Sequence, residues 1–162
     1  MPKTVIVNST PIIALSSIDR LDLLKDLYGT VIIPNAVKCE IEAKYNSKAH
    51  NQLEATNDWI CIRKINNVAQ KQTFRTQLHD GEVEVIILGQ ELIADILVMD
   101  DYSAREYAKY LGFNLIGIVG ILLLAKSRGF IHEVRPLIDR LIENGIFIST
   151  RLYADVIKIA NE

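Results

Sequence analysis

The chain has 162 residues, which is enough to bury a hydrophobic core and fits one domain over residues 1–162. Apolar residues make up 49% of the chain and charged residues 23%, a composition that excludes a disordered protein. The formal net charge of −2 excludes a global basic field for nucleic acid, although it leaves room for a local basic rim.

Cysteine and histidine are too sparse to build a site of their own. The residues concerned are Cys39, Cys61, His50, His79 and His132. Their scatter argues against a disulfide framework, a zinc site and a histidine-based metal site. The chain does not begin like a signal peptide, and its most apolar segment, 113–125, is shorter than the roughly 20 residues needed to span a membrane. We therefore expect a soluble, cytoplasmic protein without a membrane partner.

The β-branched run at 4–7 predicts a short buried strand at the start of the chain. Polar residues that favour a helix start follow it, with Ser9 or Thr10 as the N-cap. Helical apolar spacing then continues over 12–27, where Asp19 is expected to cap a second helix.

The rest of the chain alternates between predicted strands and predicted helices. The strands are expected at 31–33, 60–62, 96–99, 113–116 and 146–148. The helices are expected from 34, within 45–58, and over 80–92, 102–111, 117–126, 134–142 and 152–159. The polar stretch 66–79 is interpreted as a mobile segment. This alternation predicts an α/β fold with a central, mainly parallel sheet flanked by helices on both faces.

Acidic side chains follow or flank several of these strands. Asp100 and Asp101 come directly after a buried strand, at the edge of an α/β sheet where ligands bind. Asn8 ends the first strand, Glu40 lies on the helix after the second, and Glu82 lies in the first turn of its helix. Crowded carboxylates repel one another, and Mg²⁺ or Mn²⁺ would relieve that repulsion. The pattern predicts a carboxylate pocket for such a metal, with chemistry on phosphate.

Each acid also has a purely structural interpretation. Asp101 is placed to cap the helix that follows it. Glu82 suits the positive end of its helix dipole, and Glu40 fits an exposed helix face. Glu84 is expected to be solvated. Asp100 is the hardest to explain structurally, because it ends a buried strand beside another acid.

Five polar or cationic residues are candidates for contacts with a phosphate substrate. They are Ser9, Thr10, Arg105, Lys126 and Arg128. Ser9 and Thr10 are equally explained by capping, and Arg105 by an ion pair with a nearby acid. Lys126 and Arg128 end a helix, where cations complement the dipole.

Further candidates for contact with a nucleic-acid substrate, if one binds, lie outside these helix ends. Lys64, Lys71 and Arg75 are positioned to form a basic flap. Tyr102 and Tyr107 are candidates for stacking on a base, although tyrosines at helical spacing are more often packing residues. Two other functions are disfavoured: the glycine spacing of a dinucleotide-binding site is absent, and a phosphorelay receiver normally carries its acid pair after the first strand.

Five blocks of sequence together carry a family resemblance: VNSTPIIALSSIDRLDLL at 7–24, IIPNAVKCEI at 32–41, LHDGEVEVIILGQEL at 78–92, LVMDDYSAREYAKYLGFNLIGIVGILLLAKSRGFI at 97–131 and LIDRLIENGIFISTRLYADVI at 137–157. In this order they resemble the PIN-domain family, in the branch of PIN-like proteins predicted to bind nucleic acid. The resemblance implies a fold like that of flap nucleases and hydrolysis of single-stranded RNA with Mg²⁺ or Mn²⁺. It also implies the toxin of a toxin-antitoxin pair, with an antitoxin protein as partner, and a homodimer.

By the same resemblance, the family's acidic positions correspond to Asn8, Glu40, Glu82 and Asp100, with Asp101 adjacent. Asn8 stands where most active relatives carry aspartate, so the pocket has one negative charge fewer. Glu82 also stands where many relatives carry aspartate. Two hypotheses follow: a metal-dependent endoribonuclease, or a catalytically weak or inactive module that binds nucleic acid or protein.

Overall fold

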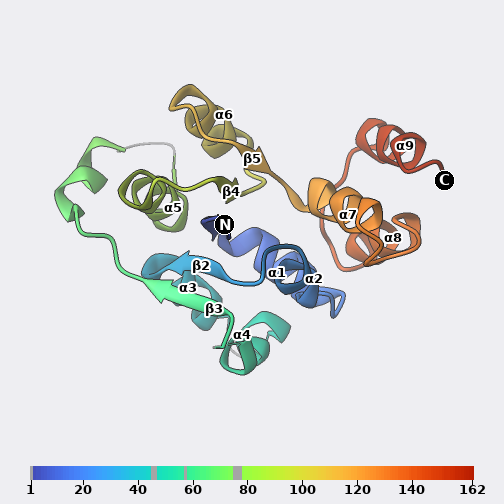
Figure 1. The fold of residues 1–162 in the computed structure, drawn as a ribbon, viewed down its shortest axis with the longest axis horizontal. Helices are drawn as coiled ribbons and strands as arrows, with labels where there is room; N and C mark the ends of the chain where they lie inside the picture. The colour runs from blue at the N-terminus through green and yellow to red at the C-terminus, as the bar shows by residue number, and fades with distance from the viewer. Residues whose placement is uncertain (1, 45–46, 57, 75–77) are drawn as a thin grey trace.

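Five parallel strands form one sheet in a computed structural model of the chain, which describes residues 2–44, 47–56, 58–74 and 78–162. The strands are β1 (Val5–Val7), β2 (Val31–Pro34), β3 (Ile60–Arg63), β4 (Ile96–Val98) and β5 (Leu115–Ile116). Their order across the sheet is β3-β2-β1-β4-β5 (Figure 1). Every paired strand in this sheet runs parallel to its neighbour, as the alternation of strands and helices predicts.

The described helices lie between these strands or follow the last of them. They are α1 (Ser9–Ser17), α2 (Asp22–Tyr28), α3 (Asn35–Ala43), α4 (Lys48–Leu53), α5 (Asp80–Leu92), α6 (Tyr102–Tyr110), α7 (Ile118–Ser127), α8 (Arg135–Glu143) and α9 (Thr150–Ile159). Two short 3₁₀ turns, η1 (Glu54–Thr56) and η2 (Val68–Thr73), lie before and after β3. Figure 1 shows α7, α8 and α9 grouped at one end of the molecule. The predicted α/β fold is confirmed.

The middle strand, β1, is the point at which the strand order reverses. Its Ile6 pairs with Ile32 of β2 on one side and with Leu97 of β4 on the other. The chain first runs outward from β1 to β2 and β3, and then returns across the sheet to β4. Right-handed crossovers in opposite directions leave a crevice at the carboxyl ends of the two strands where the order reverses. Asn8 and Asp100 follow those two strands and therefore flank the crevice.

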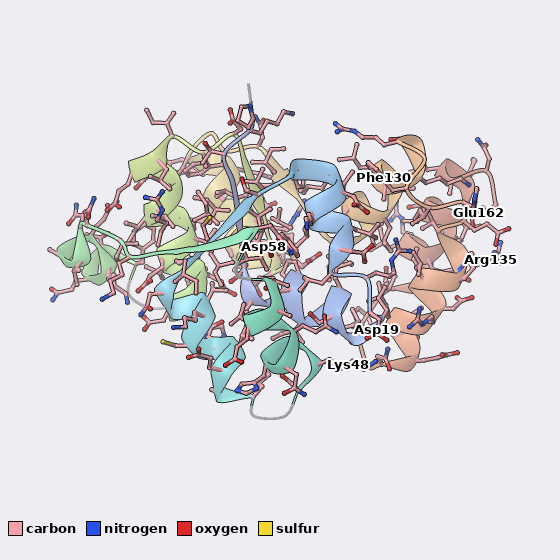
Figure 2. The ribbon with its side chains drawn as sticks, turned by 60° about the horizontal axis from the view of Figure 1, so that its bottom comes forward. Asp19, Lys48, Asp58, Phe130, Arg135 and Glu162 are labelled. Atoms are coloured by element: carbon pink, nitrogen blue, oxygen red, sulfur yellow. The ribbon has the colours of Figure 1, made fainter. Side chains whose placement is uncertain are left out.

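The predicted caps of the first two helices differ from the observed ones. Asn8, and neither Ser9 nor Thr10, is the N-cap of α1, because its side-chain oxygen accepts from the Ser9 N–H at 2.9 Å. Asp19 does not cap α2. It has a positive φ of 56°, and its carboxylate accepts from Lys48 of α4 at 3.0 Å (Figure 2).

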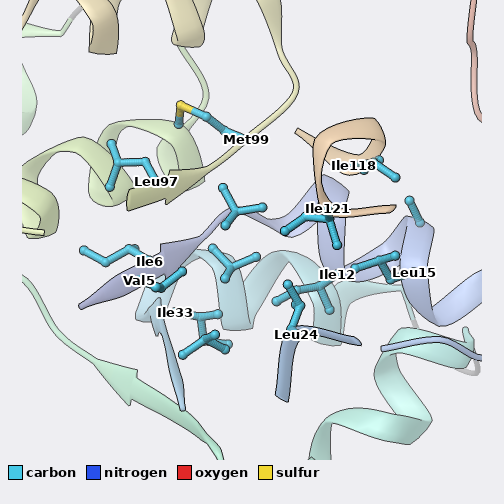
Figure 3. Packing of buried hydrophobic residues seen from close by; sticks show 14 of the residues in the cluster. Val5, Ile6, Ile12, Leu15, Leu24, Ile33, Leu97, Met99, Ile118 and Ile121 are labelled. Carbon is cyan, nitrogen blue, oxygen red and sulfur yellow. The ribbon is translucent and has the colours of Figure 1, made fainter. Parts of the chain in front are cut away.

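The core is continuous from the sheet into the helices on either side. Val5, Ile6 and Val7 are all essentially inaccessible, as expected for a parallel strand covered on both faces. Figure 3 shows side chains of β1 beside those of α1 and α7, among them Ile12 and Ile121. Burying the apolar helix faces in this way holds the strand ends, and the polar residues that follow them, in fixed positions.

One predicted strand is absent from the described structure. Residues 146–148 are not a strand: Ile146 and Ile148 pack against the core, and the Ile146 N–H donates to the Leu141 carbonyl at 3.0 Å and pairs with no strand. The apolar alternation that predicts a strand here belongs instead to the connection between α8 and α9. In the segment predicted to be mobile, 66–79, Glu91 accepts from the Asn66 and Asn67 N–H groups, and residues 75–77 lie outside the described residues.

Among the described residues, no helix has both the length and the apolar character needed to cross a bilayer.

Glu162 fastens the start of α8 to the end of α7. Its carboxylate accepts from the backbone N–H groups of Val134 and Arg135 at 2.7 and 2.8 Å and pairs with Lys126 at 2.8 Å. Figure 2 shows Arg135 and Glu162 on the same end of the molecule. Burial alone would raise the pKa of this carboxyl group, but Lys126 and the two N–H groups outweigh it and lower the pKa to about 2.

Replacing Glu162 by glutamine should lower the free energy of unfolding at pH 7 by about 1–2 kcal/mol after allowance for solvent screening. Because the pKa is lower in the folded state, the carboxylate stabilises fully above its unfolded pKa of about 4.5, and this stabilisation is lost as pH falls towards 2. Urea unfolding of wild type and Glu162→Gln should therefore differ at pH 7 and converge near pH 2. Glu143→Gln, an exposed change in α8, is the matched control, and a pH-independent difference would contradict the assignment.

Candidate functional site

Asn8 and Ser9 begin the site at the carboxyl end of β1. Asn8 is 2% exposed, and its N–H donates to the Val98 carbonyl of β4 at 2.9 Å, which ties the two strand ends together. The buried hydroxyl of Ser9 donates to a carboxylate oxygen of Glu40 at 2.6 Å. The start of α1 therefore supplies an amide oxygen and positions an acid from another helix.

Glu40 is held between α1 and α5. Its second carboxylate oxygen accepts from the Gly81 N–H at 2.9 Å. A Cβ at residue 81 would lie 2.5 Å from that oxygen, so only glycine lets the carboxylate approach the backbone this closely. The start of α5 is thus shaped around the acid of α3.

Glu82 is the most buried of the acids predicted for the site, with 7% of its surface exposed. Burial raises the pKa of its carboxyl group; the N–H of His79, which donates at 3.0 Å, opposes the rise, and the nearby charges of Asp101 and Glu40 add to it. Glu82 therefore feels the negative charge of an acid that follows β4 and of the acid of α3. Its negative charge lacks full compensation from the protein.

Asp100 is held by the start of α7. Both of its carboxylate oxygens accept from the Ile118 N–H, at 3.0 and 3.3 Å. Burial raises the pKa of the carboxyl group, while that N–H and the charge of Arg105 lower it in part. A Cβ at Gly117 would lie 2.6 Å from an Asp100 oxygen, so a second glycine makes room for a second carboxylate.

Asp101 is exposed and has a structural task of its own. Its side chain accepts from the Ala104 N–H at 3.0 Å, so it is the N-cap of α6, as its structural interpretation predicts. Its charge still raises the pKa of Glu82. Asp101 therefore adds negative charge near the site while one of its carboxylate oxygens caps α6.

These residues line two adjoining pockets. The first pocket, of about 490 Å³, is lined by Asn8, Ser9, Thr10, Glu40, His79, Asp80 and Glu82. The second pocket, of about 480 Å³, is lined by Thr10, His79, Glu82, Asp100, Asp101, Ile118, Val119, Gly145, Ile146, Phe147, Ile148 and Leu152. Glu82, Thr10 and His79 belong to both. The structure thus gathers the four predicted acids and Asn8 around a shared boundary, at the strand ends where the sheet order reverses.

The side chains at the two pockets offer carboxylate and amide oxygens, the ligand type of hard divalent cations. Among the residues that the structure describes, no three Asp, Glu, His or Cys side chains form a ready metal-binding group. Glu40 and Asp100 instead accept from Gly81 and Ile118, in cradles that a Cβ would fill. Oxygen donors are the ligands that hard divalent cations take, and burial raises the pKa of the carboxyl groups of both Glu82 and Asp100.

The candidate substrate residues divide into two groups. Thr10 lines both pockets, and Arg105 lies beside Asp100, where its guanidinium donates to the Met99 carbonyl at 2.8 Å. Lys126 and Arg128 are at the other end of α7 from Asp100, and Lys126 is bound to Glu162 and to the Ala160 carbonyl. The structure does not bring these two cations to either pocket.

The structure gives one residue of the predicted basic flap another partner and leaves a second one undescribed. Lys71 donates to Glu84 at 2.8 Å, and Arg75 lies outside the described residues. The prediction of a solvated Glu84 is wrong: the residue is 7% exposed and also accepts from the Ala36 N–H at the start of α3. Tyr107 packs edge-on against Phe74 at 5.3 Å, which supports its interpretation as a packing residue.

Two features of the site were missed in the sequence. The first is His79, which lines both pockets. Its position directly before a predicted helix start is the sequence feature that could have identified it. The second is the apolar wall of the second pocket, from Gly145 to Ile148 and Leu152, because those residues were assigned to a strand and a helix.

A family model described as DUF3368, a PIN domain, matches residues 4–162. The search of curated proteins found no match to this sequence.

Proposed function

Because the chain belongs to the PIN-domain family, we propose that it is a metal-dependent endoribonuclease that hydrolyses single-stranded RNA. PIN domains are typically nucleases and generally use divalent metals. The observation that carries the proposal is the meeting of Glu40, Glu82 and Asp100 at two pockets that share Glu82. We further propose that the protein is the toxin of a toxin-antitoxin pair and acts as a homodimer.

The acids have distinct roles in this proposal. Glu40, Glu82 and Asp100 would hold Mg²⁺ or Mn²⁺, with Asn8 and Asp101 as auxiliary groups. When bound, the metal supplies a more acidic water and shields charge on the phosphate oxygens. Glu82 and Asp100 contribute charge that the protein leaves undercompensated, as the raised pKa of each indicates. This charge favours the cation over the protein's own donors.

Substrate contacts are proposed at the rim of the same pockets. Thr10 is exposed and borders both of them, so its hydroxyl is free to meet a phosphate oxygen. Ser9 positions Glu40 through its hydrogen bond and is not assigned a substrate contact. Arg105 lines a further hollow of about 380 Å³ with Asp100 and Gly117, where a phosphate would meet a cation.

Incubation with a fluorophore-labelled single-stranded RNA tests the proposal directly. The protein should cleave it with Mn²⁺ or Mg²⁺, fail to cleave it after EDTA treatment, and recover when Mn²⁺ is returned in excess. A duplex of the same sequence should be cut much more slowly, because its paired and stacked bases cannot be splayed out onto the protein. Absence of cleavage with either metal, from protein whose thermal unfolding is cooperative, would overturn the proposal.

Asn8 favours a second candidate function, a weak or inactive module that binds an antitoxin protein or nucleic acid. Its amide oxygen already caps α1, so it is a poorer ligand than a carboxylate. An antitoxin could place a cation in the pockets where the nuclease would hold its metal. Calorimetry with Mn²⁺ separates the two: millimolar metal should give heat and a rise in unfolding temperature for the enzyme and neither for the binding module.

A further inference from the structure

The second pocket has two chemically different walls. One carries Glu82, Asp100 and Asp101, and the other is apolar. The apolar wall consists of Ile118, Val119, Gly145, Ile146, Phe147, Ile148 and Leu152. A pocket of about 480 Å³ lined by both carboxylates and hydrophobic side chains suits a ligand that has a charged part and a flat apolar part.

Phe147 is the exposed aromatic ring of that wall. It is 89% exposed, whereas Ile146 and Ile148 on either side of it pack against the core. Leaving a phenylalanine in water forgoes roughly 2 kcal/mol of burial. A ring presented in this way is available to a ligand at little cost in stability.

The backbone around Phe147 is fixed at both ends. Gly145 turns the chain with a φ of 88°, and the Ile146 N–H donates to the Leu141 carbonyl. Ser149 then caps α9 by accepting from the Leu152 N–H at 3.1 Å. The ring is therefore held beside the acids by an ordered connection, and binding need not order the backbone first.

We propose that Phe147 is the stacking surface for one unpaired nucleobase of an RNA strand whose adjacent phosphate lies at Glu82 and Asp100. The inference rests on the proposed function. Single-stranded nucleic acid is held largely by stacking on aromatic rings, and a nucleotide joins a flat base to a phosphate that a bound cation can bring to the acidic wall.

A nucleotide suits this pocket better than an apolar protein segment. Such a segment would cover Glu82 and Asp100 with groups that cannot satisfy their charges, and this is costly. The tyrosines predicted to stack, Tyr102 and Tyr107, do not line the pocket, and Tyr107 is engaged with Phe74. The aromatic contact with substrate therefore falls to Phe147.

Steady-state cleavage of a short single-stranded RNA with Mn²⁺ tests this residue. Phe147→Ala should raise KM roughly tenfold, in line with the loss of one stacked base, with kcat changed much less. Phe147→Trp should keep a low KM, and Phe147→Leu, which is apolar but cannot stack, should resemble the alanine variant. Ile159→Ala, an exposed apolar change in α9 outside the pocket, is the control and should match wild type.

A series of RNAs with a single abasic residue at successive positions identifies the base. For the wild-type protein, an abasic residue at one RNA position should raise KM as much as Phe147→Ala does. The Phe147→Ala protein should have the same KM for that RNA as for the intact one. An active wild type with unchanged KM in Phe147→Ala would overturn this inference alone. A wild-type KM in Phe147→Leu, together with loss of self-association in Phe147→Ala, would show that Phe147 contacts a second protein copy and not a base. An inactive wild type would overturn the proposed function as well.

Discussion

Asp100→Asn should lower Mn²⁺-dependent cleavage of single-stranded RNA by roughly a hundredfold or more, about 3 kcal/mol of transition-state stabilisation. Asparagine has the shape of aspartate and keeps an oxygen to accept from the Ile118 N–H, so the start of α7 should remain in place. Only the charge offered to the metal is removed. The measurement is kcat/KM on labelled RNA, together with the Mn²⁺ concentration that gives half-maximal rate.

Stability should change in the opposite direction to activity. Burial raises the pKa of Asp100, so the ionised carboxylate costs free energy in the folded protein above its unfolded pKa. Metal-free Asp100→Asn should therefore unfold at the same temperature as wild type or a higher one at pH 7, and the difference should shrink below the unfolded pKa of about 4. Asp155→Asn, an exposed change in α9, is the control. Full cleavage by a folded Asp100→Asn would show that the charge is not needed.

The acid positions could be predicted from the sequence because they depend on local rules. Asp100 follows a run of buried apolar residues, and Glu82 lies in the first turn of a periodic helix. Parallel strands bring their carboxyl ends to one edge, so the meeting of these residues follows from the alternation of strands and helices.

The predictions that were wrong concern residues whose environment depends on tertiary packing. Glu84 reads as an exposed helix acid, but α3 packs its start against α5 and uses the carboxylate as an acceptor for Ala36. Residues 146–148 have the alternation of a strand, yet Ile146 and Ile148 alternate because they pack on the core while Phe147 faces solvent. Periodicity reports which side chains are buried and does not report whether a neighbouring strand is present.

Asn8→Asp is expected to raise Mn²⁺ affinity roughly tenfold and to increase cleavage at limiting metal, because a carboxylate is a stronger ligand for a hard cation than an amide. The cap of α1 should survive, since aspartate and asparagine are equally good N-caps. The introduced charge faces Glu40 and Glu82 in the first pocket, so the metal-free variant should be less stable than wild type at pH 7. Added Mn²⁺ should then raise its unfolding temperature by more than it raises that of wild type.

Asn67→Asp provides a matched control, because Asn67 also caps a helical turn, accepting from the Gln70 N–H, but does so outside both pockets. It should leave Mn²⁺ affinity and cleavage at their wild-type values. Cleavage that is much faster in Asn8→Asp than in wild type would identify the natural chain as a nuclease weakened by having asparagine at this position. Equal Mn²⁺ affinity in Asn8→Asp and wild type would mean that residue 8 serves α1 alone, and the metal would then have to be held without any ligand from the end of β1.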